Sequence, residues 1–163
     1  MSDGWGIRIY DENNREICMI QVMGDGEPTK KMYEVVEFLA VRDLVNGYSH
    51  SDDINGMEDL VAQIVTFLKL KYYFTVKKFV KYKDRPRDKI YRMNSRDKIY
   101  RMIIAGAIYV LPPGSPNRGE WEYHIKYNGS SVMIEVYKYL DEESGFDRIW
   151  HGSPKEYLEF FSI

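Results

Sequence analysis

The spacing of apolar residues divides the first part of the chain into strand-like segments and a loop. Residues 5–10 (WGIRIY) and 16–22 (EICMIQV) alternate apolar and polar positions on either side of a polar stretch. This alternation is typical of strands with one buried face, so it predicts an N-terminal β-hairpin. Residues 23–30 (MGDGEPTK) contain two glycines and a proline, which predicts a loop.

The next two segments follow the spacing of an amphipathic helix. In residues 31–45 the apolar side chains recur three or four positions apart, and the NG dipeptide at 46–47 suits the end of a helix. Residues 57–70 carry a continuous apolar stripe. Two helices are therefore predicted, and we expect Val61 and Ile64 of the second to be buried.

The second half of the chain is predicted to be richer in strands. Residues 72–82 (YYFTVKKFVKY) are aromatic and β-branched, which favours a strand. Residues 99–111 (IYRMIIAGAIYVL) are apolar enough for a buried strand, and residues 112–119 (PPGSPNRG) predict a loop. Near the C-terminus, Ser153 can cap a short helix that has proline at its first position and glutamate at its third.

Residues 121–139 (WEYHIKYNGSSVMIEVYKY) give the strongest local prediction, a β-hairpin. The NG pair at 128–129 is the preferred two-residue turn, because both positions accept positive φ. The cross-strand pairs predicted from this turn are Ile125–Val132, Tyr123–Ile134, Trp121–Val136, Glu122–Glu135 and His124–Met133. Directly opposed carboxylates destabilise a hairpin, so we expect a basic neighbour or a bound cation to offset Glu122 and Glu135.

Together these segments predict a single α+β domain spanning residues 1–163. A twisted antiparallel sheet, built from both hairpins and the strand before residue 112, is expected to pack against the helices at 31–45 and 57–70. The C-terminal helix should close one edge of the sheet. A chain of 163 residues is long enough for one such domain with one core.

Composition narrows the cellular setting. The single cysteine, Cys18, cannot form an internal disulfide and is expected to be a small apolar filler. The N-terminus lacks the pattern of a signal peptide, and the longest apolar run, residues 103–111, is shorter than the roughly 20 residues that a membrane helix needs. We therefore expect a cytoplasmic protein without membrane contact. A net charge of −2 argues against a wholesale nucleic-acid binder.

The common catalytic motifs are missing from the sequence. There is no Walker-type or dinucleotide-binding glycine loop, and the three histidines, at positions 50, 124 and 151, lack metal-ligand spacing. We therefore assign no catalytic residue, metal ligand or cofactor, and expect a binding protein rather than an enzyme.

Four polar, glycine-containing loops, at 24–28, 46–47, 52–56 and 117–120, are the candidate binding elements. Binding residues concentrate in loops carried by a rigid scaffold. The candidate ligand-binding residues are Asp25, Asn46, Asn55, Arg118, Glu120, Trp121 and Tyr123. An arginine beside a glycine suits a phosphate or carboxylate, so a small anionic ligand is expected. Two alternatives stay open: the loops are only turn chemistry, or Asp25, Glu120 and Glu122 act as acid and base in a small enzyme.

An unusual repeat lies in the middle of the chain, where Arg87–Met93 recurs unchanged as Arg96–Met102. Basic residues alternate with tyrosines over residues 77–102, a combination that suits stacking on bases and pairing with phosphates. The candidate anion or nucleic-acid contacts here are Lys89, Arg92, Lys98 and Arg101. The alternative is a tandem duplication that the fold tolerates, since loop closure costs grow slowly with length.

Several segments, taken in order, resemble a family of small uncharacterised proteins of bacteriophages and their bacterial hosts. These segments are YDENNREI, GDGEP, FLAVRDLVNG, NGMEDLVAQIVTFLK, YVLPPGSPNRGEWEYHIKY and GSPKEYLEF. The family has no known activity that could be assigned to this chain. The resemblance implies a phage-type accessory protein in the host cytoplasm, with a candidate counter-defence role, that captures a small ligand such as a nucleotide signal or blocks a host protein.

The match departs at residues 73–104, where this chain holds additional residues that include the whole repeat. This segment is therefore interpreted as an insertion. The 14 tyrosines, an exposed hairpin and a near-neutral net charge also favour symmetric self-association, so we expect a homo-oligomer.

Overall fold

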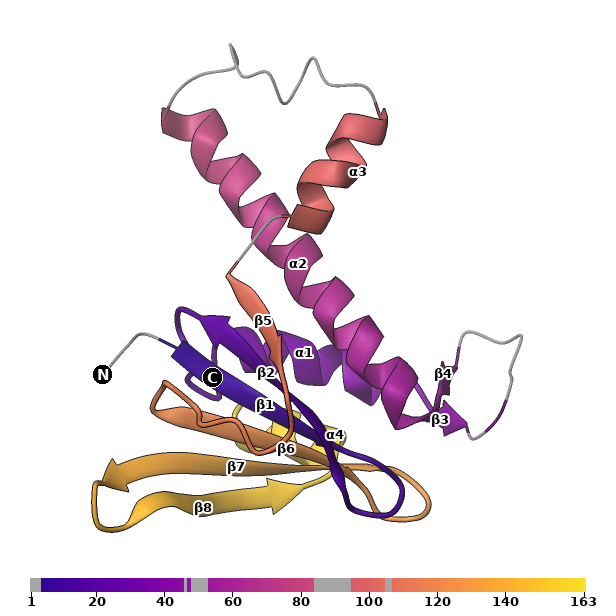
Figure 1. The fold of residues 1–163 in the computed structure, drawn as a ribbon, viewed down its shortest axis with the longest axis vertical. Helices are drawn as coiled ribbons and strands as arrows, with labels where there is room; N and C mark the ends of the chain where they lie inside the picture. The colour runs from indigo at the N-terminus through magenta and orange to yellow at the C-terminus, as the bar shows by residue number, and fades with distance from the viewer. Residues whose placement is uncertain (1–3, 46, 48–52, 84–94, 105–106) are drawn as a thin grey trace.

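The computed structural model describes residues 4–45, 47, 53–83, 95–104 and 107–163, with residues 73–83, 95, 98 and 102 described by their backbone alone. A six-stranded sheet, in the order β5-β2-β1-β6-β7-β8, carries α1, α2 and α4 on one face, and a two-stranded sheet pairs β3 with β4 (Figure 1). The elements are β1 (Gly4–Tyr10), β2 (Glu16–Met23), α1 (Lys31–Ala40), β3 (Leu44–Val45), β4 (Ile54–Asn55), α2 (Gly56–Lys83), α3 (Ser95–Ile104), β5 (Ile108–Leu111), β6 (Trp121–Tyr127), β7 (Val132–Asp141), β8 (Gly145–Gly152) and α4 (Pro154–Phe160).

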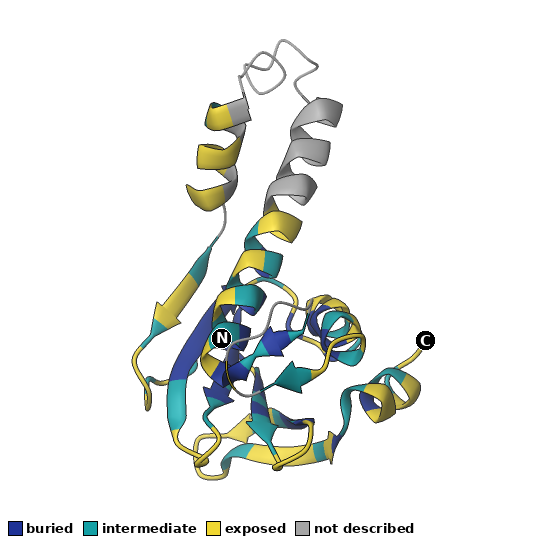
Figure 2. Cartoon of the chain, turned by 90° about the vertical axis from the view of Figure 1, so that its right-hand side faces the viewer, coloured by how far each residue is buried: buried dark blue, intermediate teal, exposed yellow. Residues whose placement is uncertain are grey.

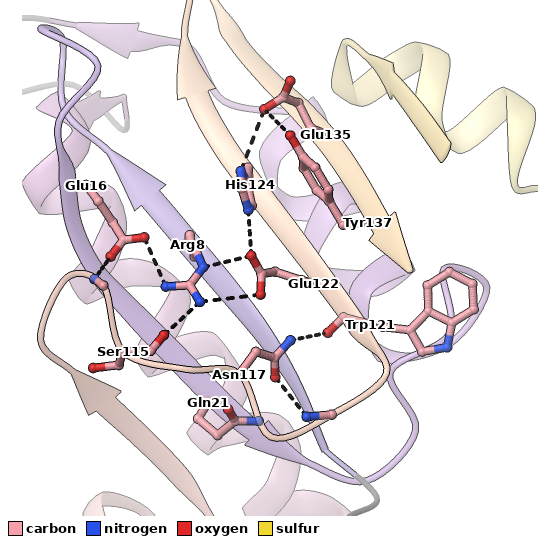
Figure 3. Close-up of polar contacts among 12 residues, drawn as sticks. Arg8, Glu16, Gln21, Ser115, Asn117, Trp121, Glu122, His124, Glu135 and Tyr137 are labelled. Atoms are coloured by element: carbon pink, nitrogen blue, oxygen red, sulfur yellow. Dashed lines mark hydrogen bonds and ion pairs between the residues drawn. The ribbon is translucent and has the colours of Figure 1, made fainter. Parts of the chain in front are cut away.

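The predicted α+β class is confirmed, but the sheet is not wholly antiparallel. β1 pairs with β6 in parallel, and the other four pairs of the large sheet are antiparallel. The parallel pair arises because the chain leaves β5 at one edge and re-enters the sheet at β6, on the far side of β1. Residues 112–120 therefore cross the sheet face that the helices leave open (Figure 3).

The core lies between the sheet and helices α1, α2 and α4. Alternate residues of β1 and β6 point into it, including the fully buried Trp5 and Tyr123. α2 contributes Ile64, which is fully buried as predicted, whereas Val61 is only partly buried. Full burial of a side chain such as Ile64 contributes roughly 1.5–3 kcal/mol. The capping box predicted at Ser153 is present at the start of α4.

α2 is longer than the helix predicted for residues 57–70. It begins at Gly56 and runs to Lys83, so the strand predicted for residues 72–82 is wrong. Residues 71–83 contain neither glycine nor proline and include several lysines, which are good helix formers, so an established helix continues through them. α1, in contrast, ends at Ala40 rather than at residue 45.

The strand predicted for residues 99–111 is also largely wrong. Residues 95–104 form α3, which contains the second copy of the repeat, and only residues 108–111 form a strand. That strand, β5, is an edge rather than a buried strand, and Tyr109 and Val110 are each 54% exposed. The first copy of the repeat lies outside the described residues. Together α2 and α3 project from the sheet (Figures 1 and 2). We call α3 together with the distal half of α2, residues 70–83, the helical arm.

The 121–139 hairpin forms with a register two residues away from the predicted one. The turn spans four residues, because the Asn128 side chain accepts hydrogen bonds from the backbone of Ser130 and Ser131 and stabilises the longer turn. A shift of two keeps every side chain on its predicted face. The observed pairs are Ile125–Ile134, Tyr123–Val136, Trp121–Lys138, Glu122–Tyr137 and His124–Glu135. β7 continues into β8, a strand that the sequence patterns did not predict.

Candidate functional site

The sheet face without helices carries a polar network centred on Arg8. Arg8 lies on β1 between core-facing neighbours, so the alternation of the strand directs its guanidinium to the opposite face. Its Nε donates to Glu122 Oε1 at 2.7 Å and its Nη1 to Glu16 Oε1 at 3.1 Å (Figure 3). Its Nη2 donates to the carbonyl oxygen of Ser115 at 2.7 Å. One arginine thus ties together β1, β2, β6 and the crossing loop.

His124 extends this network toward β7. Its Nε2 lies 2.7 Å from Glu122 Oε1, and its ring stacks on Tyr137 with centroids 4.2 Å apart. Its Nδ1 lies 3.3 Å from the hydroxyl of Tyr10 and 3.7 Å from Glu135 Oε1. Both ring nitrogens therefore have polar partners, which fixes the orientation of the imidazole.

The basic neighbours expected for the two glutamates are present. Glu135 accepts from Lys126 Nζ at 2.8 Å and from Arg148 Nη1 at 2.7 Å. Burial opposes ionisation of Glu135, but these two hydrogen bonds outweigh it and lower its pKa. The pKa of Glu122 is lowered in the same way, because hydrogen bonds from His124 and Arg8 outweigh burial. Both carboxylates are therefore ionised at neutral pH, and their charges are compensated within the protein.

Side chains on the same polar face of the sheet also hold the crossing loop, residues 112–120, in place. The backbone N–H of Gly114 donates to Glu16, and that of Arg118 donates to Gln21 Oε1 at 3.2 Å. Gly119 lies so close to β1 that a Cβ there would sit 1.6 Å from the carbonyl oxygen of Gly4. Only glycine allows this approach. Gly119 of the 117–120 loop (NRGE) is therefore required for packing against β1.

The loop at residues 24–28 (GDGEP) packs against the same end of β1, on the side of the sheet that carries the helices. A Cβ at Gly26 would sit 2.4 Å from the Cβ of Trp5, and the hydroxyl of Tyr123 donates to the carbonyl oxygen of Gly26. The structure thus brings two of the four predicted loops to one end of the sheet, although from opposite faces. Gly26 and Gly119 therefore each have a structural reason that does not depend on a ligand.

The predicted ligand-binding residues that the structure describes do not form one site. Asp25, Arg118 and Glu120 are exposed at this end of the sheet, where the half-buried Trp121 lies with its ring 5.3 Å from Lys138 Nζ. Tyr123 is fully buried and so does not line a surface site. Asn55 lies at the opposite end, next to the start of α2, where Met57 N–H donates to Glu12 of the β1–β2 turn. Asn46 lies outside the described residues.

The structure also places the predicted acid–base residues and the predicted anion contacts of the repeat. Glu122 faces the open side of the sheet and is held in ion pairs, whereas Asp25 lies on the helix side beside α1. The structure therefore does not join them in an acid–base pair. Arg101 is exposed in the last turn of α3. Lys89 and Arg92 lie outside the described residues, and Lys98 is described by its backbone alone.

A cleft that the sequence did not indicate opens between α1, α2 and the β2–β5 edge. Its volume is about 300 Å³. That volume lies at the lower end of the range for small-molecule sites, which is roughly 300–1,000 Å³. Apolar side chains line its inner part, among them Val22, Phe67, Leu68 and Ile108.

Among the described residues, the rim of the cleft carries two ammonium groups and one carboxylate. Lys71 Nζ lies 3.3 Å from Glu34 Oε1, and Lys31 Nζ donates to the carbonyl oxygen of Met23 at 3.1 Å. The sequence patterns did not indicate these residues, because Lys31 and Lys71 lie outside the glycine-containing loops and Lys71 lies beyond the predicted helix end at residue 70. Continuing the helical spacing by one turn from Phe67 would have placed Lys71 on the same face.

The chain matches no known protein family, no curated protein and no solved structure with which it was compared. Within the described residues, no group of three His, Cys, Asp or Glu side chains is arranged to hold a metal ion. In the same part of the chain no helix has the length and apolar character to span a membrane.

Proposed function

We propose that the protein is a binding protein that captures a small anionic ligand in the cleft between α1, α2 and the β2–β5 edge. The observation that carries this proposal is the combination of an apolar interior with Lys31 and Lys71 at the rim. Ligand sites are commonly apolar hollows with a few polar groups that fix orientation. Here the apolar part holds a ring or hydrocarbon body, and the ammonium groups pair with a phosphate or carboxylate.

The contacts at the rim leave room for such a ligand. The side chains of Lys71 and Glu34 are 50% and 46% exposed, so their ion pair is worth no more than about 1 kcal/mol. An anionic group that contacts Lys71 competes with Glu34 in this exposed ion pair. The volume suits a ligand about the size of a single nucleotide, which favours a mononucleotide or cyclic nucleotide over a longer one.

The resemblance to phage and bacterial proteins adds a biological setting to this proposal. A phage-type accessory protein that removes a nucleotide signal from the host cytoplasm needs only to bind that signal tightly. Such a counter-defence role requires no catalytic group. It is therefore consistent with a cleft whose rim, in the part that the structure describes, carries charges but no paired nucleophile and base.

Calorimetric titration with a panel of mononucleotides, cyclic nucleotides and ADP-ribose tests the proposal. Lys31→Gln and Lys71→Gln should each weaken binding about tenfold, because each removes one charge-assisted contact. Lys155→Gln, on the exposed surface of α4, is the matched control and should leave the affinity unchanged. If no anion of the panel binds, or if Lys155→Gln weakens binding as much as the rim variants, the cleft is not the site.

The fate of the ligand separates capture from catalysis. After incubation the protein is denatured and the released nucleotide is identified by mass spectrometry. Intact nucleotide supports capture. Converted nucleotide would instead support the small carboxylate-based enzyme, and the rim variants would then be compared by turnover.

The helical arm supports a second candidate, binding of single-stranded nucleic acid. Arg96, Tyr100 and Arg101 are exposed on α3, and the guanidinium of Arg96 lies 6.0 Å from the Tyr100 ring centroid. Exposed arginines beside an aromatic ring suit phosphates and stacked bases. Salt-dependent retardation of an oligonucleotide that weakens in an Arg96→Gln/Arg101→Gln variant would support this candidate over small-ligand capture.

A further inference from the structure

β5 leaves one backbone edge of the large sheet open. It is the first strand in the sheet order, and among the described residues no strand pairs with its outer side. Its sequence, Ile-Tyr-Val-Leu, contains no charged residue and no proline. Figure 2 shows it at the margin of the molecule, with much of its length exposed. Natural edge strands usually carry a charge, a proline or a bulge, because a bare edge attracts another strand.

The other edge of the same sheet is protected in the expected way. β8 carries exposed Asp147, Arg148 and His151 along its length. A charged edge disfavours addition of a further strand. The contrast between the two edges singles out β5 as the surface suited to strand pairing.

The pairing of β5 with β2 determines which of its backbone groups face outward. The N–H of Met23 donates to the carbonyl oxygen of Ala107 at 3.2 Å, and the antiparallel register then continues through β5. Residues that bond to a neighbour alternate along an antiparallel strand. Ala107, Tyr109 and Leu111 therefore direct their backbone groups toward β2, and Ile108 and Val110 direct theirs to the open edge.

We propose that β5 is a dimer interface, in which a second copy of this chain adds its own β5 in antiparallel orientation across a two-fold axis. Ile108 would exchange backbone hydrogen bonds with Val110 of the partner subunit. Tyr109 would face Tyr109 of the partner subunit at the axis, as a cross-strand aromatic pair on the face opposite the helices. The two sheets then form one continuous sheet of twice the width.

Three observations favour a second copy as the occupant. The strand is self-complementary, since neither copy brings a charge to the shared edge. The net charge of the chain is only −2, so two copies repel each other weakly. Ile103 and Ile104 of α3, the element before β5, are also exposed apolar side chains that a neighbouring copy can cover.

The symmetry of the pairing limits the assembly to a dimer. Pairing β5 with β8 of another copy would leave free edges and build an open fibre, and the charges of β8 oppose it. Pairing β5 with itself consumes the bare edge of both copies and closes the assembly. This interface does not depend on the ligand proposed for the cleft.

Light scattering and sedimentation at tens of micromolar test the interface. The wild-type protein should be dimeric. Tyr109→Lys, which places like charges on the axis, should raise the dissociation constant at least tenfold. Ile149→Lys is the matched control, because Ile149 lies on β8 with a similar exposure, 47% against 54%. A monomeric wild-type protein, or a dimer that only Ile149→Lys disrupts, would overturn the proposal.

Crosslinking tests the register even if Tyr109→Lys folds poorly. Facing residues of a non-hydrogen-bonded antiparallel pair have Cα atoms about 4.5 Å apart, which suits a disulfide. Tyr109→Cys should therefore crosslink to its own counterpart under mild oxidation, and Val110→Cys should crosslink far more slowly. Cys18 is buried and gives little background. Equal crosslinking of both variants, or none at Tyr109→Cys, would contradict the two-fold register.

Discussion

Glu122 and His124, two residues apart on β6, place their side chains on the same face of the sheet, with His124 Nε2 2.7 Å from Glu122 Oε1. The same carboxylate accepts from Arg8 on the neighbouring strand. This shared carboxylate links β1 to β6 across the parallel strand pair of the large sheet. The polar face is thus part of what holds the sheet together, rather than a free reactive surface.

The state of Glu122 makes the stability of the fold depend on pH. Its pKa in the folded protein lies below the ordinary value of 4.5, because hydrogen bonds from His124 and Arg8 outweigh burial. The ionised carboxylate therefore stabilises the fold above about pH 4.5, and this contribution is lost as the pH falls through the lower folded pKa. We expect Glu122→Gln to reduce the free energy of unfolding at neutral pH, and the difference from wild type to shrink in acid.

Urea denaturation at neutral pH and at several values below 4.5 measures this difference. Glu142→Gln, in the exposed β7–β8 turn, serves as the control and should change stability little at any pH. A difference for Glu122→Gln that stays constant into acid would show that the carboxylate is not stabilised by its partners.

Arg8 should be coupled energetically to Glu122. Both side chains are largely buried, at 13% and 7% exposure, so Arg8→Met leaves two carboxylates without their central cation. Removing one partner of a buried pair costs roughly 3–5 kcal/mol. The double variant Arg8→Met/Glu122→Gln should lose less stability than the two single variants added together, by roughly 0.5–3 kcal/mol. Additive losses in a denaturation cycle would argue against direct coupling.

The local patterns predicted the strongly periodic elements and failed where tertiary context decides. The N-terminal hairpin, the two helices that cover the sheet and the capped C-terminal helix follow from spacing and turn chemistry alone. Residues 72–82 have the composition of a strand, but they continue a helix that already exists, and propensity yields to that context. The parallel β1–β6 pair depends on where the chain re-enters the sheet, which no local pattern records.

The candidate site was predictable only in part for a similar reason. Sequence reasoning found the loops at 24–28 and 117–120, and the structure brings both against β1. The sequence does not distinguish a glycine that lies against a ligand from one that lies against a strand, because both positions require a residue without a side chain. The cleft depends on Lys31 and Lys71, which are 40 residues apart in the chain and meet only through the packing of α1 beside α2.

Gly119 should be among the glycines least tolerant of substitution. A Cβ at this position would meet the carbonyl of Gly4 at 1.6 Å, and the backbone of β1 cannot yield without disturbing the sheet. At Gly129, where φ is +97° and the space is open, alanine costs only the strain of a left-handed backbone, about 1–2 kcal/mol. We expect Gly119→Ala to lower the melting temperature more than Gly129→Ala. Equal shifts in calorimetry would mean that the crossing loop is not packed as described.

The second copy of the repeat lies in α3, so the first copy can be deleted separately. Deleting Arg87–Ser95 joins Pro86 directly to the second copy, and α3 keeps residues Arg96–Ile104. The deletion removes three basic residues and one acidic residue, so the net charge changes from −2 to −4. If the repeat is a tolerated duplication, the free energy of unfolding should change by no more than about 0.5 kcal/mol, because loop length affects stability weakly.

The same deletion separates the cleft from the helical arm as the binding element. Small-ligand affinity should be unchanged, because Lys31 and Lys71 are untouched. If the arm binds single-stranded nucleic acid, oligonucleotide affinity should fall and its salt dependence should flatten by roughly one to two in logarithmic slope, because fewer phosphates are neutralised. Titrations of both ligands at two salt concentrations measure the two effects in one preparation. A large loss of small-ligand affinity would move the site from the cleft to the arm.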